Sequence, residues 1–161
     1  MSLRDTAGPF SPGHNHRACI RDAMTAAERV CHAKAVRLTK IRKRVLELIW
    51  AGHEPTTAYQ LLKKLRAEKE NAEPPTVYRA LDFLVENNLV HRIESLNAFI
   101  GCHHPDREHV SQFMICSHCK QVAELSNPLA INQAVSKEAN KIGFKVLKQT
   151  IEIRGVCAAC Q

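Results

Sequence analysis

Aromatic residues and long apolar runs are scarce in this chain of 161 residues. Phe, Tyr and Trp together make up 5% of the chain, although apolar residues as a whole make up 45%. A small core of this kind often needs a staple, such as a metal ion. No apolar run approaches the ~20 residues of a bilayer-spanning helix, and residues 1–10 lack a hydrophobic signal-peptide core. We therefore expect a soluble, cytoplasmic protein with no membrane partner.

Seven cysteines are present without any sign of a secreted chain. In a secreted protein they would indicate a disulfide framework. In a cytoplasmic protein with two C-x2-C pairs, ligation of a metal by thiolates is favoured instead.

Basic residues exceed acidic ones, with a formal net charge of +7 and a pI of about 9.2. Up to Ser95 the chain has 16 Lys and Arg against 11 Asp and Glu, and from Leu96 onward it has 7 against 5. The excess suggests a polyanionic partner. Because the basic residues lie mainly in the first part and the cysteine pairs in the second, we expect two domains.

Hydrophobic periodicity divides the first part into helices and a hairpin. We expect a flexible tail over residues 1–17, then a first domain over 18–101 with a hinge in 96–101. Its helices are expected over 18–35, after a Thr39 N-cap, from a capping box at Thr57, and from Pro74. The segments "NNLVHRIE" and "NAFIGC" then form a hairpin. This order predicts a winged helix-turn-helix domain in an α+β protein.

The last helix before the hairpin has polar side chains near its N-terminal end. Arg79 has the donors to read guanine bidentately, and Tyr78 and Thr76 can reach phosphate or a thymine methyl group. The basic run "RLTKIRKR", with Arg37 and Arg42, is expected to contact phosphates. The alternative is an amphipathic helix and a solvated basic face, with no DNA role. Local pattern alone leaves the two alternatives even, with double-stranded DNA as the candidate partner.

The second part, residues 102–161, predicts a small α/β domain. Strands are expected at "HVSQFMIC", "KQVAEL" and "FKVLKQTIEI", with a helix at "NPLAINQAVSKEANKIG" that ends at Gly143. The strand, helix and strand after the first C-x2-C pair would return the second pair to the first.

The two C-x2-C pairs have the spacing of metal-binding knuckles. Cys116 and Cys119 form the first pair, and Cys157 and Cys160 form the second. Four thiolates favour a tetrahedral zinc ion, and such a closed set leaves no open position for chemistry. We therefore predict a structural zinc site. Redox thiols are the alternative, but no thioredoxin-like βαβ pattern surrounds either pair.

More potential ligands are present than one zinc ion needs. After the four-thiolate set is removed, His91, Cys102, His109 and Glu124 remain. His91 and Cys102 lie on the two arms of the expected hairpin, and His109 and Glu124 flank the first knuckle. One ion held by these residues would join the two domains, and its thiolate ligand favours zinc over ferrous iron.

Other interpretations of these residues remain open. Histidines near a linker are often simply solvated, and Cys102 would then be a buried apolar residue. His103 and His104 are candidates for a third metal site. A zinc hydrolase or thiol oxidoreductase would need an open metal position or a reactive thiolate. Cys102 with its two histidines is the only candidate for that role, and no H-E-x-x-H pattern or nucleophile elbow supports it. We therefore expect no enzyme activity.

Several motifs together resemble the ferric uptake regulator (Fur) family, and most closely its zinc uptake regulator branch. They are "PPTVYRALDFL", His91 in the hairpin, the segment 102–109 and the two C-x2-C pairs, and the resemblance runs from Ala27 to Cys160. The segment "HHPDREH" lies further from the first C-x2-C pair than in the iron-sensing branch, with Cys102 in front of it, which favours zinc.

The resemblance implies a homodimeric bacterial repressor with a DNA-binding winged helix and a dimerisation domain. It implies one structural and one regulatory zinc ion per subunit, a pseudo-palindromic operator, and zinc-uptake genes as targets. Tyr78 and Arg79 match the family's DNA-contacting residues. The regulatory ligands implied by the resemblance are His91, Cys102, His109 and Glu124. Sensing of ferrous iron or peroxide by the same architecture is the alternative.

Overall fold

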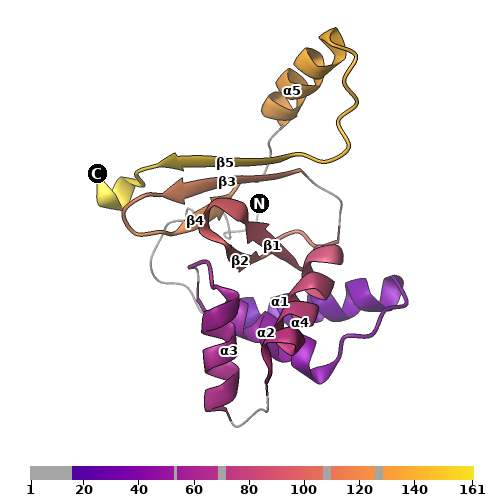
Figure 1. The fold of residues 1–161 in the computed structure, drawn as a ribbon, viewed down its shortest axis with the longest axis vertical. Coiled ribbons are helices and arrows are strands. Elements are labelled where there is room, and N and C mark those ends of the chain that lie inside the picture. The colour runs from indigo at the N-terminus through magenta and orange to yellow at the C-terminus, as the bar shows by residue number, and fades with distance from the viewer. Residues whose placement is uncertain (1–15, 53, 69–71, 107–109, 126–128) are drawn as a thin grey trace. The chain divides into compact units, whose positions relative to one another are not determined.

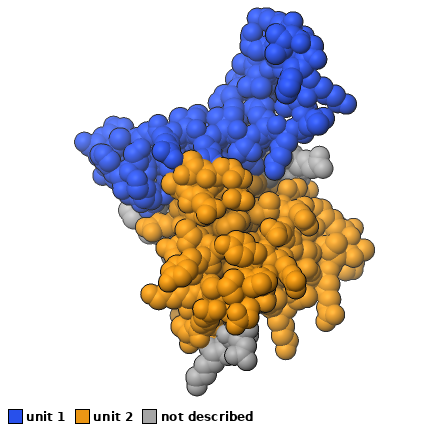
Figure 2. All heavy atoms as spheres, viewed as in Figure 1, with its two compact units in different colours: residues 1–11, 109–161 blue, residues 12–108 orange. Residues whose placement is uncertain are grey.

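The structure, a computed structural model, describes the chain apart from residues 1–15, 53, 69–71, 107–109 and 126–128. The described residues fall into two compact units, which run over 16–106 and 110–161 (Figure 2). We call them the N-terminal unit and the C-terminal unit. Within the described residues, no helix combines the length and apolarity needed to cross a bilayer.

The N-terminal unit has the element order of a winged helix-turn-helix, as the sequence predicts (Figure 1). Its elements are α1 (His16–Ala33), α2 (Lys40–Trp50), α3 (Ala58–Ala67), α4 (Pro74–Glu86), β1 (Val90–Ile93), a 3-10 turn (Glu94–Leu96) and β2 (Ala98–Gly101). Pro74 and Pro75 occupy the first turn of α4, where their missing N–H groups cost no helical hydrogen bond.

The starts of α2 and α3 differ in how they are capped. The Gln60 backbone N–H donates to the Thr57 hydroxyl oxygen (3.2 Å), and the Thr57 backbone N–H donates to Gln60 Oε1 (2.8 Å). This confirms the predicted capping box of α3. Thr39 is the N-cap of α2 by position, but its side chain makes no capping bond. Its hydroxyl oxygen is buried and has no hydrogen-bond partner among the described residues.

The hairpin of β1 and β2 is fixed inside the N-terminal unit. His91 pairs with Ile100 across the two antiparallel strands. Thr56 and Phe99 exchange backbone hydrogen bonds of 2.9 Å in both directions, which ties β2 to the segment before α3. The structure therefore differs from the hinge expected over 96–101, because two neighbours hold this segment.

The residues that follow β2 also belong to the N-terminal unit. The Cys102 backbone N–H donates to the Leu89 carbonyl oxygen (3.0 Å). Asp106 accepts from Arg29 on α1, at 3.2 Å from Nε and 2.6 Å from Nη2. The two units therefore divide further along the chain than the boundary expected after Gly101.

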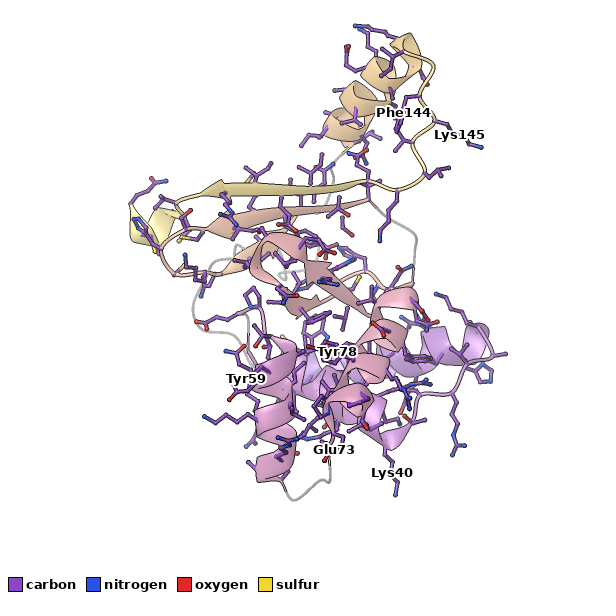
Figure 3. The ribbon with its side chains drawn as sticks, in the orientation of Figure 1. Lys40, Tyr59, Glu73, Tyr78, Phe144 and Lys145 are labelled. Atoms are coloured by element: carbon purple, nitrogen blue, oxygen red, sulfur yellow. The ribbon has the colours of Figure 1, made fainter. Side chains whose placement is uncertain are left out.

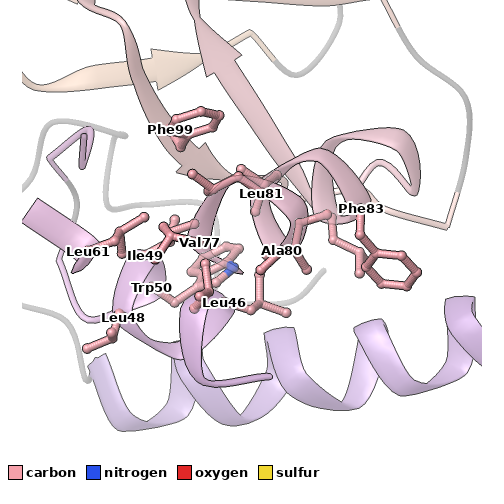
Figure 4. Close-up of a cluster of buried hydrophobic side chains, with 14 of the residues drawn as sticks. Leu46, Leu48, Ile49, Trp50, Leu61, Val77, Ala80, Leu81, Phe83 and Phe99 are labelled. Carbon is pink, nitrogen blue, oxygen red and sulfur yellow. The ribbon is translucent and has the colours of Figure 1, made fainter. Parts of the chain in front are cut away.

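A single hydrophobic cluster holds the N-terminal unit together (Figure 4). It draws on α2, α3, α4 and β2, and its labelled members are Leu46, Leu48, Ile49, Trp50, Leu61, Val77, Ala80, Leu81, Phe83 and Phe99. Complete burial of one such large apolar side chain stabilises a fold by about 1.5–3 kcal/mol. The helix that carries Tyr78 and Arg79 is thus packed on a rigid support.

The C-terminal unit is a three-stranded sheet in which one helix separates the second strand from the third along the chain. Its elements are β3 (Ser111–Cys116), β4 (Val122–Glu124), α5 (Leu129–Lys141), β5 (Thr150–Gly155) and a 3-10 turn (Ala158–Cys160). The strand order is β4-β3-β5, with β4 antiparallel and β5 parallel to β3. The strand predicted over 144–153 begins only at Thr150, so this prediction was wrong for 144–149, which pair with no strand among the described residues.

Helix α5 and the segment after it expose apolar side chains. No residue of α5 is buried among those described, and Ile142, Phe144 and Leu147 are 79%, 61% and 87% exposed. Figure 3 shows Phe144 and Lys145 on this segment. Asn132 on α5 accepts hydrogen bonds from Gln112 Nε2 (2.7 Å) and Gln149 Nε2 (3.2 Å). These hydrogen bonds connect α5 to β3 and to the segment before β5, while Leu129 at the start of α5 is 59% exposed.

Candidate metal centres

The two cysteine knuckles meet at one end of the C-terminal sheet. Cys116 ends β3 and lies opposite Gly155 at the end of the parallel strand β5. The Ser117 backbone N–H donates to the Gly155 carbonyl oxygen (2.8 Å), which joins the first knuckle to the strand that leads to the second. The parallel pairing of β3 with β5 is therefore what brings Cys157 and Cys160 to the first pair.

The four sulfurs of Cys116, Cys119, Cys157 and Cys160 have the spacing of metal ligands. All lie within 4.8 Å of one another, and all four cysteines are free thiols. Cys119 Sγ is 3.8 Å from Cys157 Sγ. Zinc–thiolate bonds of about 2.3 Å in a tetrahedron give sulfur–sulfur distances of roughly 3.8 Å. The cluster thus fits a zinc ion without rearrangement.

Hydrogen bonds within the cluster separate the pKa values of its thiols. The backbone N–H of Cys157 lies 3.4 Å from Cys116 Sγ, and together with the Cys119 backbone N–H it lowers the pKa of Cys116 to about 5. The Cys157 and Cys119 side chains raise the pKa of Cys160 to about 12. Cys116 is therefore the most acidic of these thiols, and zinc must displace protons from Cys119 and Cys160, whose pKa values are raised.

His91 and Cys102, two residues of the second predicted metal site, lie close together in the N-terminal unit. His91 in β1 and Cys102 after β2 are 9% and 3% exposed. A ring nitrogen of His91 and Cys102 Sγ lie within 4.8 Å of each other. A nitrogen and a sulfur donor that converge in a buried position suit zinc.

The remaining predicted metal ligands lie in several different places. Glu124 is the last residue of β4 in the C-terminal unit, where it pairs with Phe113. His109 lies outside the described residues. His103 is exposed with its ring against Trp50, and His104 is half-buried. Among the described residues, neither joins a group of three potential ligands.

Exposed polar and aromatic side chains mark the N-terminal parts of α3 and α4. On α4, Tyr78 is 55% exposed, Arg79 is exposed and Thr76 is half-buried, while Val77 and Leu81 face the core. Sequence analysis missed Tyr59, which is 75% exposed in the first turn of α3. Its position off the apolar stripe of that helix was the available signal. Both tyrosines can be followed in Figure 3.

The two arginines predicted in the basic run differ in environment. Arg37 is exposed. The Arg42 guanidinium lies 3.5 Å from the centroid of the Phe83 ring and donates to the Arg37 carbonyl oxygen (2.6 Å). Arg42 therefore connects the start of α2 to α4 through a cation–π contact.

Comparisons with known proteins point to one family. Residues 33–154 match the ferric uptake regulator family. The chain is 40% identical to the zinc uptake regulation protein of Escherichia coli (strain K12) over 145 residues, which cover 89% of this chain and 84% of the relative. A solved zinc uptake regulator complexed with zinc and DNA gives a TM-score of 0.82 at 39% identity, with 88% of this chain and 94% of that chain covered. Holo XcZur gives 0.78 at 44% identity, with 86% and 96% covered.

Proposed function

The chain belongs to the ferric uptake regulator family, and we propose that it is a zinc-responsive transcriptional repressor that binds operator DNA. The similarity to a zinc uptake regulator that carries both zinc and DNA supports this function. The observation that carries it is the buried pair of His91 and Cys102, because it belongs to a different unit from the four-cysteine cluster and offers a sulfur and a nitrogen donor.

Each subunit is proposed to hold two zinc ions with different tasks. The ion at Cys116, Cys119, Cys157 and Cys160 is structural. The regulatory ligands are His91 and Cys102 together with Glu124 and His109, as the sequence predicts. Zinc held by these four would fix the orientation of the winged helix relative to the dimerisation domain. Without it, only a fraction of dimers has the spacing that fits DNA, and the apparent affinity falls by that fraction.

DNA recognition is assigned to the exposed residues of the helix-turn-helix. Arg79 is proposed to contact a base edge in the major groove, and Tyr78 and Thr76 to contact phosphate or a thymine methyl group. The exposure of Tyr59 in the first turn of α3 supports a further contact there. Arg37 is proposed to contact phosphate. We assign Arg42 the task of holding α2 against Phe83 in addition to any phosphate contact.

A homodimer accounts for the uncovered apolar side chains of the C-terminal unit. Ile142, Phe144 and Leu147 are largely exposed, and β5 lies at the edge of its sheet, where its outer hydrogen-bonding groups can pair with another strand. A two-fold dimer would cover these groups and present two winged helices to a pseudo-palindromic operator. Such a regulator acts in the cytoplasm, beside bacterial DNA, and we expect no catalytic turnover from it.

The test is a titration of DNA binding against three buffered metals. A DNA fragment is first selected from a random-sequence pool by the zinc-loaded protein, and its affinity is then measured against free Zn²⁺, Fe²⁺ and Mn²⁺. We expect a pseudo-palindrome whose affinity rises by about 5- to 150-fold with zinc, the usual range of allosteric coupling. Equal affinity after removal of the regulatory ion would overturn the proposal. A response to iron alone would favour an iron sensor.

A further inference from the structure

Trp50 reaches from the helix-turn-helix to the end of the wing. It is the one tryptophan of the chain, ends α2 and is 9% exposed within the core cluster (Figure 4). The centroids of the Trp50 and His103 rings are 5.1 Å apart, with their planes at 72°. This is an edge-to-face contact. The indole therefore holds the residue that follows Cys102.

The same indole fixes the residue that precedes Cys102. A Cβ at Gly101 would lie 2.2 Å from Trp50 Cε2 and 2.3 Å from Nε1. Carbon atoms in contact are normally about 3.5–4.0 Å apart, so no side chain fits at this position while the indole stays. The need for glycine here comes from the close approach of the ring.

Three contacts restrain the backbone at Cys102, one made by Cys102 itself and two made by its neighbours in the chain. Its own N–H donates to the Leu89 carbonyl oxygen. Gly101 lies against the indole of Trp50, and the His103 ring makes an edge-to-face contact with the same indole. His91 is held independently by its pairing with Ile100. We propose that Trp50 is a positioning residue for Cys102, which sets where its sulfur lies relative to His91. This inference rests on the proposed regulatory zinc site.

Trp50 also connects the ligand pair to the helix that carries the DNA-contacting residues. Its ring shares the buried cluster with Val77 and Leu81 of α4 (Figure 4). Zinc ligation by Cys102 therefore restrains its chain neighbours Gly101 and His103. Both contact Trp50, which packs in the core of the helix-turn-helix. This packing is a physical route by which the metal site and α4 influence each other.

The test is a double-mutant cycle between positions 50 and 101. Gly101→Ala puts a methyl group into the rigid indole and displaces the backbone at Cys102. We expect it to weaken zinc binding at the regulatory site by about 10- to 100-fold, the usual cost of losing support for a metal ligand. Trp50→Leu removes the atoms that the methyl group would meet. In that background, Gly101→Ala should cause little further loss.

Two measurements separate positioning from general stability. Zinc affinity is measured by competition with a chromophoric chelator. Co²⁺ is then bound at the regulatory site while the four-cysteine site keeps its zinc, and the thiolate-to-cobalt absorption band reports whether Cys102 is still a ligand. Leu48→Ala is the matched control because Leu48 is 6% exposed in the core on the same helix. It should lower the melting temperature without changing the band.

The outcomes distinguish this inference from the function on which it rests. An unchanged affinity and band in Gly101→Ala, an equal loss in the Trp50→Leu background, or an equal loss in Leu48→Ala would each refute the positioning role. If the parent protein binds no second zinc ion, the proposed function fails first. If it binds one and the variants match it, only the role of Trp50 fails.

Discussion

Cys119 Sγ lies 3.8 Å from Cys157 Sγ, although 38 positions separate the two residues in the chain. That distance is about the edge of a zinc–thiolate tetrahedron and is far longer than a disulfide bond of about 2.05 Å. The backbone thus presents the two knuckles at the separation that ligation requires. The structural ion is expected to hold β5 and the turn after it against β3.

Cys157→Ser is expected to remove the structural zinc and to unfold the C-terminal unit. Structural zinc in small domains contributes about 10–16 kcal/mol of binding free energy, which is comparable to the whole stability of a typical domain. Native mass spectrometry for zinc content and thermal melting by circular dichroism measure the two effects. Cys19→Ser is the control because Cys19 is a half-buried cysteine on α1, and this variant should keep the structural zinc. A Cys157→Ser protein with full zinc content would contradict the assignment.

Among the four thiols of the structural site, Cys116 is expected to stay deprotonated to the lowest pH, near pH 5. The pKa of Cys116 is lowered from 9.0 to about 5 by backbone N–H groups of Cys157 and Cys119. A lowered pKa in the folded state gives stability that is complete above the unfolded value of 9.0 and is lost as the pH falls toward 5. Protons therefore compete weakly for this sulfur at neutral pH. Ultraviolet thiolate absorbance of the metal-free protein and of its Cys116→Ser variant between pH 8 and 4 tests this. A difference between the two that vanishes already between pH 8 and 7 would be inconsistent with it.

Cys102→Ser is expected to abolish the zinc response while the dimer stays folded. The variant loses the one thiolate of the proposed regulatory set and keeps the four-cysteine cluster. Its DNA affinity should stay at the low value of the protein without regulatory zinc, measured by fluorescence anisotropy across buffered zinc concentrations. Cys31→Ser is a matched control, because Cys31 is also 3% exposed but packs in the core. A normal zinc response in Cys102→Ser would remove Cys102 from the site.

Arg79→Ala is expected to weaken operator binding by about 5- to 150-fold, since a bidentate base contact contributes about 1–3 kcal/mol. Specificity at the contacted base pair should relax as well. Asp82→Ala, on the exposed side of the same helix, is the control and should not weaken binding. Competition between operator and single-base variants measures both effects. If Arg79→Ala reduces affinity equally for all sequences, Arg79 contacts phosphate and not a base.

Two threonines at helix N-termini should respond differently to replacement by alanine. Thr57→Ala removes the capping box of α3 and should lower the free energy of unfolding by about 1 kcal/mol. Thr39→Ala removes a hydroxyl that makes no capping bond and should be neutral or slightly stabilising. Thermal melts of the zinc-loaded variants make the comparison, and equal losses would contradict the difference in capping.

Local patterns made much of the fold and of the metal centre predictable. The capping box at Thr57 and Gln60 depends on four consecutive residues, and the C-x2-C spacing fixes a knuckle regardless of its surroundings. The winged helix follows from the order of such local elements. The proximity of His91 and Cys102 required only that the predicted hairpin form.

The features that sequence analysis missed depend on distant neighbours. Thr39 has the right residue type for a cap, but its side chain makes no capping hydrogen bond. Residues 144–149 alternate like a strand and yet pair with no strand in the described part of the chain, because β5 meets β3 only from Thr150. The close approach of Trp50 to Gly101 is a consequence of packing, and no spacing in the chain encodes it. The exposure of Tyr59, by contrast, follows from its position off the apolar stripe of α3.

The parallel pairing of β3 with β5 has a consequence for the order of folding. A ribosome delivers Cys116 and Cys119 well before Cys157 and Cys160, and a parallel partner arrives only after the crossover through α5. Contacts between distant segments form slowly because the intervening loop must close first. A zinc ion bound early by Cys116 and Cys119 would have only two protein ligands until Cys157 and Cys160 arrive. Cellular zinc supply would then govern how quickly new molecules mature as well as how they respond.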